Sequence, residues 1–301
     1  ITTKKGKSGK PQITFKADWG SSDFAMDYRP VMGGEERREY IYNGLKLGQY
    51  RDMLNYNSSL TPEDIKKGKK PYTEEEFATL PVEYADEKID KYAPVPWCGY
   101  VDWNDIMFKK GNHQTYEASI SGGTDKFKYY SSISYLKQEG VAINSGLERI
   151  SGRLNVDYQA TDRLKVGANM LFATVNQDVY SEGTSYTSPF YSSRNAVVPS
   201  DAVYNEDGSW NRDFIRNSDR NPLLAATYDY TREYVNRSFN TIFAEYEFIK
   251  NLKLKSTFSY DYTNTKGKDW SDPRTSNGDD VNGGMSKKFY EYKKMVWANQ
   301  L

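Results

Sequence analysis

Few residues in this chain are of types that carry covalent or metal chemistry. Among its 301 residues there is one histidine, His113, and one cysteine, Cys98. They provide neither a multi-histidine metal site nor an internal disulfide. The acidic run from Gly278 to Asn282 lacks the regular acid spacing of a calcium loop, so we expect a solvated turn there. No Gly-rich phosphate cradle or nucleophile elbow is present. We therefore expect no catalytic residue, no metal ligand and no cofactor, in a protein that is not an enzyme.

Aromatic side chains in a long polar stretch are the candidate ligand contacts. Aromatic rings offer flat surfaces to sugars or peptides, and 15% of the chain is aromatic, with 26 tyrosines. The same rings also pack loops against neighbouring loops or against a partner protein, which is the more ordinary role of a loop aromatic. Under the first interpretation, the residues that contact ligand are Tyr180, Tyr186, Phe190, Tyr191 and Trp210.

The elements that must position these residues are strands, because apolar and polar residues alternate along much of the chain. Between Asn112 and Val175 there are four such runs, and in the first of them Tyr116, Ala118 and Ile120 alternate with polar residues. A period of two places successive side chains on opposite faces of a strand, so we expect an antiparallel meander. Further strands are expected over residues 13–19, 234–248, 252–262 and 289–301.

The alternation is lost over residues 21–110, where helix signals replace it. Thr61 precedes a proline and two acids, and Thr73 precedes three glutamates. Both patterns are typical of helix starts. A third helical stretch over residues 35–53 is weakened by two glycines. We expect short helices inside a long connection between the first two strands.

Short and long connections alternate along the chain. Short turns are expected at Gly122, Thr161 and Lys250, and long loops over residues 21–110, 140–148, 177–231 and 264–286. An up-and-down sheet then has all short turns at one end and all long loops at the other. This sorting is typical of outer-membrane barrels, and each run approaches the roughly 9–11 residues that a tilted strand needs to cross a bilayer.

Several short motifs, in chain order, resemble SusC/RagA-type TonB-dependent outer-membrane transporters. Residues 1–6, Ile-Thr-Thr-Lys-Lys-Gly, resemble the end of the plug domain just before the first barrel strand. Residues 102–108, Asp-Trp-Asn-Asp-Ile-Met-Phe, resemble the segment before the second strand. The match continues in the following strands over residues 119–123, 135–140, 153–157 and 164–169. The order of the motifs makes the resemblance specific.

The resemblance implies an all-β fold: a partial antiparallel up-and-down transmembrane β-barrel, of about the first eight strands, with long extracellular loops that contain short helices. It implies that residues 1–11 are the end of the plug domain and a linker, and that residues 12–301 are the N-terminal part of the barrel. The implied function is TonB-dependent import of a glycan or oligopeptide across the bacterial outer membrane, within a SusCD-like complex. The implied partners are a SusD-like surface lipoprotein, TonB through an N-terminal region outside this sequence, outer-membrane lipid and the substrate.

Charged residues on the polar strand phases are expected to face the lumen of such a barrel. We expect them to pair with one another or with the plug, and they are Lys16, Asp18, Glu117, Arg153, Asp157 and Lys165. Basic and acidic residues number 41 each, so net charge gives no reason to expect nucleic acid as a partner.

Two other classes of protein share parts of this pattern. A soluble β-sandwich carbohydrate-binding module would have the same alternation, but it would pack its apolar phases against one another. A β-rich glycoside hydrolase needs two carboxylates roughly 5–9.5 Å apart, and no pair of acids stands out. The sorting of the loops and the ordered resemblance favour the transporter.

Overall fold

The computed structural model of the chain describes residues 6–25, 31–93, 100–180, 185–214 and 220–301. Residues 1–5, which carry most of the plug-like motif, and Cys98 lie outside the described residues. The chain divides into two compact units. The strand unit consists of Ile1–Met26, Met107–Phe190 and Pro222–Leu301, and the helical unit consists of Asp27–Ile106 and Tyr191–Asn221. The predicted domain boundary at residue 11 is a different division and stays a prediction.

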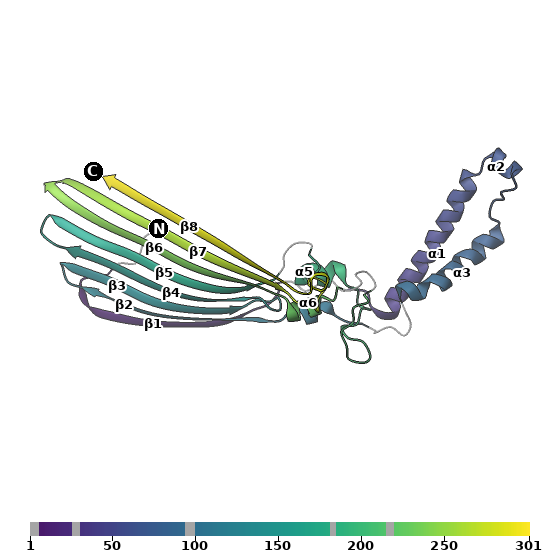
Figure 1. Ribbon diagram of the computed structural model, residues 1–301, viewed down its shortest axis with the longest axis horizontal. Helices are drawn as coiled ribbons and strands as arrows, with labels where there is room; N and C mark the ends of the chain where they lie inside the picture. The colour runs from purple at the N-terminus through teal and green to yellow at the C-terminus, as the bar shows by residue number, and fades with distance from the viewer. Residues whose placement is uncertain (1–5, 26–30, 94–99, 181–184, 215–219) are drawn as a thin grey trace. The chain divides into compact units, whose positions relative to one another are not determined.

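Eight strands form one antiparallel sheet in which neighbours in sequence are neighbours in space (Figure 1). This confirms the predicted up-and-down meander, with β1 and β8 at the two edges of the sheet. The strands are β1 (Gly9–Ser22), β2 (Gly111–Gly123), β3 (Phe127–Glu139), β4 (Gly146–Gln159), β5 (Leu164–Val179), β6 (Tyr230–Ile249), β7 (Leu252–Ser271) and β8 (Gly284–Gln300).

Local hydrogen bonds set the short turns. Between β2 and β3, the Thr124 N–H donates to the Phe127 carbonyl at 2.7 Å, and the Phe127 N–H donates to Thr124 Oγ1 at 3.1 Å. Between β4 and β5, Thr161 Oγ1 accepts from the Leu164 N–H at 3.0 Å. Between β6 and β7, Asn251 has a φ of 69°, a left-handed conformation that asparagine tolerates. These three turns lie at one end of the sheet, and the longer connections lie at the other (Figure 1).

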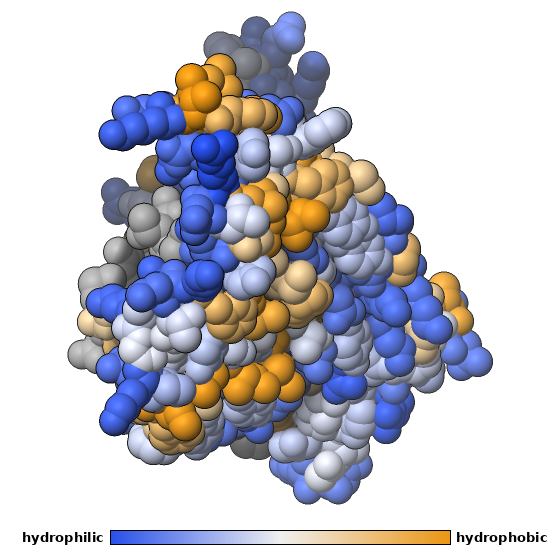
Figure 2. Space-filling model, turned by 90° about the vertical axis from the view of Figure 1, so that its left-hand side faces the viewer, coloured by the Kyte–Doolittle hydropathy of each residue, from blue (hydrophilic) through white to orange (hydrophobic). Residues whose placement is uncertain are grey.

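One face of the sheet is apolar and uncovered. Residues paired across the ladder point to the same face, so Ile133, Gly152 and Phe172 form one row across β3, β4 and β5. Ile13 is 79% exposed, Ile133 is 60% exposed and Phe172 is 52% exposed. Figure 2 views the molecule from the short-turn end and shows hydrophobic side chains interspersed with hydrophilic ones on its surface. Large apolar side chains gathered on one exposed face of a sheet mark contact with lipid or with another protein.

The opposite face carries paired charges. Lys165 Nζ lies 3.3 Å from Asp157 Oδ2, and Arg237 Nη2 lies 3.1 Å from Asp261 Oδ2. The pair between Lys165 and Asp157 agrees with the expectation that charges on this phase pair with one another. Polar side chains on one face and apolar side chains on the other are the arrangement of a transmembrane barrel strand.

The helical unit contains a long helical hairpin. Its elements are α1 (Gly34–Ser59), α2 (Pro62–Lys66), α3 (Glu74–Tyr92) and most of α4 (Trp103–Met107). Both predicted helix starts are confirmed, because Thr61 and Thr73 each form a capping box. Helix α1 is longer than the predicted stretch. It packs against α3, since Met53 of α1 and Ala85 of α3 are both buried and Arg38 pairs with Asp90 at 2.7 Å.

Four shorter helical segments complete the described structure. They are α5 (Pro189–Tyr191), the π-helical turn η1 (Ser192–Ala196), α6 (Pro222–Tyr228) and the 3-10 turn η2 (Asp279–Val281). In the described ranges of the chain, no helix combines the length and apolarity needed to span a membrane.

The assignment of the two faces is tested by placing a charge on each. Ile133 and Ser134 are adjacent on β3 and point to opposite faces, so Ile133→Arg is expected to destabilise the full-length protein in bilayers by about 2–4 kcal/mol. The control variant, Ser134→Arg, introduces its charge opposite Glu117 on the polar face, and we expect a change of less than about 1 kcal/mol. Denaturant titration in lipid vesicles measures both values. Equal losses in the two variants would contradict the assignment of the faces.

Candidate functional site

The structure distributes the five predicted ligand-contact residues over both units. The strand unit contains Tyr180, Tyr186 and Phe190, and the helical unit contains Tyr191 and Trp210.

Two of the five residues lie together. The ring centroids of Tyr180 and Phe190 are 5.7 Å apart, and Phe190 also lies 4.8 Å from the ring of Phe108. In the helical unit, Trp210 lies 4.7 Å from the ring of Tyr204, which precedes it in the same loop. Ligand contact by the five residues stays a prediction.

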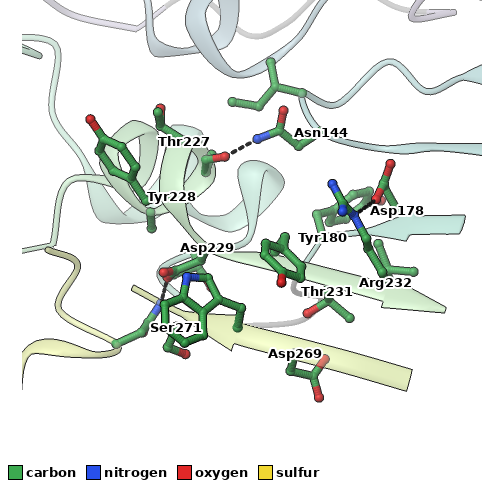
Figure 3. Close-up of a pocket in the computed structure, with 18 of the residues that line it drawn as sticks. Asn144, Asp178, Tyr180, Thr227, Tyr228, Asp229, Thr231, Arg232, Asp269 and Ser271 are labelled. Carbon is green, nitrogen blue, oxygen red and sulfur yellow. Dashed lines mark hydrogen bonds and ion pairs between the residues drawn. The ribbon is translucent and has the colours of Figure 1, made fainter. Parts of the chain in front are cut away.

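The strand unit has a hollow of about 330 Å³ at its long-loop end (Figure 3). We call it the loop hollow. It is bounded by the loop after β3, by the end of β5, by α6 with the start of β6, and by the end of β7. Its walls include the predicted residue Tyr180 and a set of polar and charged side chains, which are Asn144, Asp178, Asp229, Arg232, Asp269 and Asn277.

An ion pair forms part of the rim of the loop hollow. Arg232 Nε donates to Asp178 Oδ1 at 2.8 Å, and the two residues are direct partners across β5 and β6. The Arg232 guanidinium also lies 4.7 Å from the centre of the Tyr230 ring. Both charged side chains are about half exposed, so solvent screens the pair and it stabilises the fold little. Figure 3 shows the pair at the edge of the loop hollow. A guanidinium has five N–H donors, so a single hydrogen bond to Asp178 does not exhaust its capacity to bind a polar ligand.

Asp229 fixes the wall that α6 and the β7–β8 loop make together. Its carboxylate accepts hydrogen bonds from the Asp272 N–H at 2.7 Å, from Thr275 Oγ1 at 2.9 Å and from Asn277 Nδ2 at 2.8 Å. Thr275 is 1% exposed, so the loop closes over this carboxylate. Removal of Asp229 would leave a buried hydroxyl and a backbone N–H without this acceptor.

The carboxylate of Asp272 also holds the β7–β8 loop, through an ion pair with Arg274. Arg274 donates to Asp272 through Nε at 2.7 Å and through Nη2 at 3.0 Å, and its guanidinium stacks 3.6 Å from the centre of the Tyr228 ring. Hydrogen bonds from the side chain and backbone of Arg274 lower the pKa of Asp272 to about 2. Both groups remain charged at neutral pH, and the stacked guanidinium anchors the loop to α6.

The side chain of Asn144 connects the loop after β3 to α6. Asn144 Nδ2 donates to the Ala226 carbonyl, and Asn144 has a φ of 54°, in the left-handed region (Figure 3). Ordered loop backbone therefore holds the loop hollow on this side.

The chemistry available in the loop hollow is reversible binding. Carboxylates, amides and one guanidinium offer hydrogen bonds, and Tyr180 and Trp270 offer ring surfaces. In the part of the chain that the structure describes, no three histidine, cysteine, aspartate or glutamate residues are placed to hold a metal ion.

The sequence did not predict most of the residues of the loop hollow. Asp178 and Arg232 are 54 positions apart and meet only because β5 pairs with β6 across a long connection. The alternation along β5 and β6 does indicate the face of each residue, since both belong to the outward-facing set of their strands. The pairing register of β5 with β6, which brings the two residues together, can be known only from the structure.

The pairing of Asp272 with Arg274 predicts how the β7–β8 loop responds to acid. Because the folded pKa lies below the ordinary value of 3.8, the stabilisation is complete above that value and is lost as the pH falls through about 2. Hydrogen exchange over residues 272–283 of the full-length protein, corrected with an unstructured peptide of the same sequence, should show protection at pH 5 and its loss between about pH 4 and 2. The Asp272→Asn variant should lack this protection at pH 5 as well as at the lower pH. Unchanged protection in that variant would show that Asp229 alone holds the loop.

The chain is similar in sequence to TonB-dependent receptors. It is 30% identical to TonB-dependent receptor P3 of Formosa agariphila over 220 residues, which are 72% of this chain and 21% of that receptor. It is 27% identical to receptor P39 of the same organism over an alignment of 311 residues, which covers 99% of this chain and 25% of that receptor. The chain thus spans about a quarter or less of the length of these relatives. No family model matches the chain.

The fold is similar to that of part of a solved transporter. A structure of the RagAB peptide transporter has a TM-score of 0.69 with this chain at 22% sequence identity, and the match covers 99% of this chain and 33% of that one. The RagAB peptide importer in its closed-closed state gives a TM-score of 0.66 over the same share of this chain. The chain therefore belongs to the family of TonB-dependent receptors, as the resemblance predicts, and its fold is similar to that of part of the RagAB transporter.

Proposed function

We propose that the protein containing this chain imports a nutrient, a glycan or an oligopeptide, across the bacterial outer membrane in a TonB-dependent manner. The observation that carries the proposal is the two-faced, eight-stranded meander with sorted loops, in a chain similar to TonB-dependent receptors over most of its length. Its uncovered apolar face suits lipid, and its charged face suits the wet interior of a barrel.

We infer that the loop hollow contributes to substrate contact before passage. It combines ring surfaces, carboxylates and one arginine, groups that bind either sugar hydroxyls or the backbone and termini of a peptide. Three solved structures with similar folds are of the RagAB peptide importer or transporter, which favours an oligopeptide among these substrates. The predicted contacts Tyr180, Tyr186, Phe190, Tyr191 and Trp210 are part of the same proposal.

The proposed partners follow from the type of transporter. A SusD-like surface lipoprotein would cover the long-loop end, TonB would act through a segment outside this sequence, and outer-membrane lipid would surround the apolar face. In this mechanism, ligand binding at the loops is followed by rearrangement of the plug and by passage through the lumen. It requires no covalent step.

A soluble carbohydrate-binding module is the less favoured alternative. Such a module would bury its apolar strand phases in a core, whereas several large side chains of these phases are exposed here, among them Leu154 at 40% and Ile13 at 79%. We therefore retain the transporter.

Fractionation of native membranes tests the proposal directly. We expect the full-length protein in the outer membrane, extracted only by detergent, together with a SusD-like lipoprotein identified by mass spectrometry. Released small molecules in the same preparation would identify the substrate class. Recovery in the soluble fraction would overturn the transporter assignment.

The role of the rim ion pair is tested by removing one charge. Arg232→Gln in the full-length protein should weaken binding of the co-purified ligand about tenfold or more, because a hydrogen bond to a charged group contributes about 1.5–3 kcal/mol. Lys293→Gln is the matched control, since Lys293 also pairs with an acid, Glu291, but does not line the loop hollow. Calorimetry on the purified complex measures both dissociation constants. Equal effects in the two variants would remove the loop hollow from the ligand site.

A further inference from the structure

A second, apolar hollow lies on the outward face of the strand unit, near the short-turn end. We call it the outer groove. It has a volume of about 530 Å³ and crosses β4, β5, β6 and β7. One row of its residues, linked by direct pairing across the ladder, is Tyr158, Val166, Ala244 and Ser256.

The neighbouring row explains the shape of the outer groove. It consists of Val156, Ala168, Ile242 and Phe258, again linked by direct pairing. Phe258 on β7 is 41% exposed and forms one wall, and Ile242 is 52% exposed and projects from the floor. Tyr158 on β4, 45% exposed, forms the opposite wall. Between the walls, alanines on β5 and β6 leave space that a larger side chain would fill.

The outer groove offers few hydrogen-bonding groups to water. Its lining is hydrocarbon except for the hydroxyls of Tyr158 and Ser256. Ser256 Oγ accepts a hydrogen bond from the Trp297 indole Nε1–H at 2.8 Å, so a protein donor already satisfies it. A hollow lined mainly by hydrocarbon favours an apolar occupant.

The position of the outer groove indicates which apolar molecule covers it. The groove is continuous with the lipid-suited face, because its rows belong to the same outward phase as Ile133 and Phe172. The two turns beside it expose Arg163 and Lys250 together with one acid, Asp162. An acyl chain in the groove would therefore place an anionic headgroup close to two basic side chains.

We propose that the outer groove is a lipid-binding site that holds one acyl chain of a glycerophospholipid, with the phosphate toward Arg163 and Lys250. A hollow retains one lipid longer than the flat remainder of the apolar face does, because more of the acyl chain is in contact with protein. The proposal does not depend on import, since the outer groove lies at the end of the sheet opposite the loop hollow.

Filling the outer groove tests the proposal. Ala168→Phe and Ala244→Phe each add a ring within the hollow. Ala118→Phe adds the same ring to the same outward face, between Phe15 and Ile133 on neighbouring strands, but outside the groove. The full-length proteins are extracted from membranes in mild detergent, and retained lipids are counted and identified by native mass spectrometry. Recovery in the outer membrane and unchanged heat-modified mobility on gels confirm that each variant folds.

We expect wild-type protein and the Ala118→Phe control to retain a glycerophospholipid, and the two groove variants to retain at least fivefold less. Arg163→Gln together with Lys250→Gln should shift the retained species away from anionic lipids while leaving acyl-chain retention in place. Equal retention in all variants, no retained lipid in wild-type protein, or a second protein chain or a lipopolysaccharide in place of the phospholipid would overturn the proposal. Ligand binding at the long-loop end should be unchanged in every variant, so loss of import and loss of lipid are separate outcomes.

Discussion

The structure depends on one constraint: backbone N–H and C=O groups within a membrane must be paired, because lipid offers them no partner. Within the sheet, the ladders from β1 to β8 meet this constraint with direct pairing along almost every strand, and among the described residues only the outer edges of β1 and β8 have no strand partner. The register shifts lie between Gly9 and Gln12 and between Glu247 and Ile249, both near the short-turn end. Because the register is kept elsewhere, the side-chain alternation stays in phase from strand to strand, and this creates one apolar and one polar face.

Strand length gives the two ends of the sheet different roles. β6 and β7 each contain 20 residues, which corresponds to about 66 Å, whereas the hydrocarbon core of a bilayer is about 30 Å thick. Even tilted, such strands extend beyond the membrane. At the long-loop end the outward phase becomes polar, with Asp178, Arg232 and Lys268 in one row. In the proposed transporter, the change from apolar to charged residues on one face marks where lipid contact ends and solvent begins.

The sequence predicted the strand order and the loop sorting because period-two alternation and short turns are local signals. It placed β7 over residues 252–262, whereas the strand continues to Ser271. The alternation of apolar and polar residues stops where both faces become polar, so the pattern could not show the extension. Residues that are far apart in sequence, such as Asp178 and Arg232, were not predicted, because a long connection does not fix the register of β5 with β6. Gly44 and Gly48 weakened the prediction of α1, and packing against α3 overrides their low helix propensity.

The loop hollow and the outer groove both contain residues from the outward-facing set of β6, yet they are different kinds of site. Arg232 and Ala244 both belong to the outward phase of β6, 12 positions apart. At about 3.3 Å per residue they are separated by roughly 40 Å along the strand, which at the tilt of a barrel strand is about the thickness of the hydrocarbon core. Arg232 therefore lies among solvated loops, where a guanidinium can exchange water for a ligand, while Ala244 lies where a missing side chain leaves space for hydrocarbon. The phase of a residue determines its face, and its height along the strand determines which chemistry that face can perform.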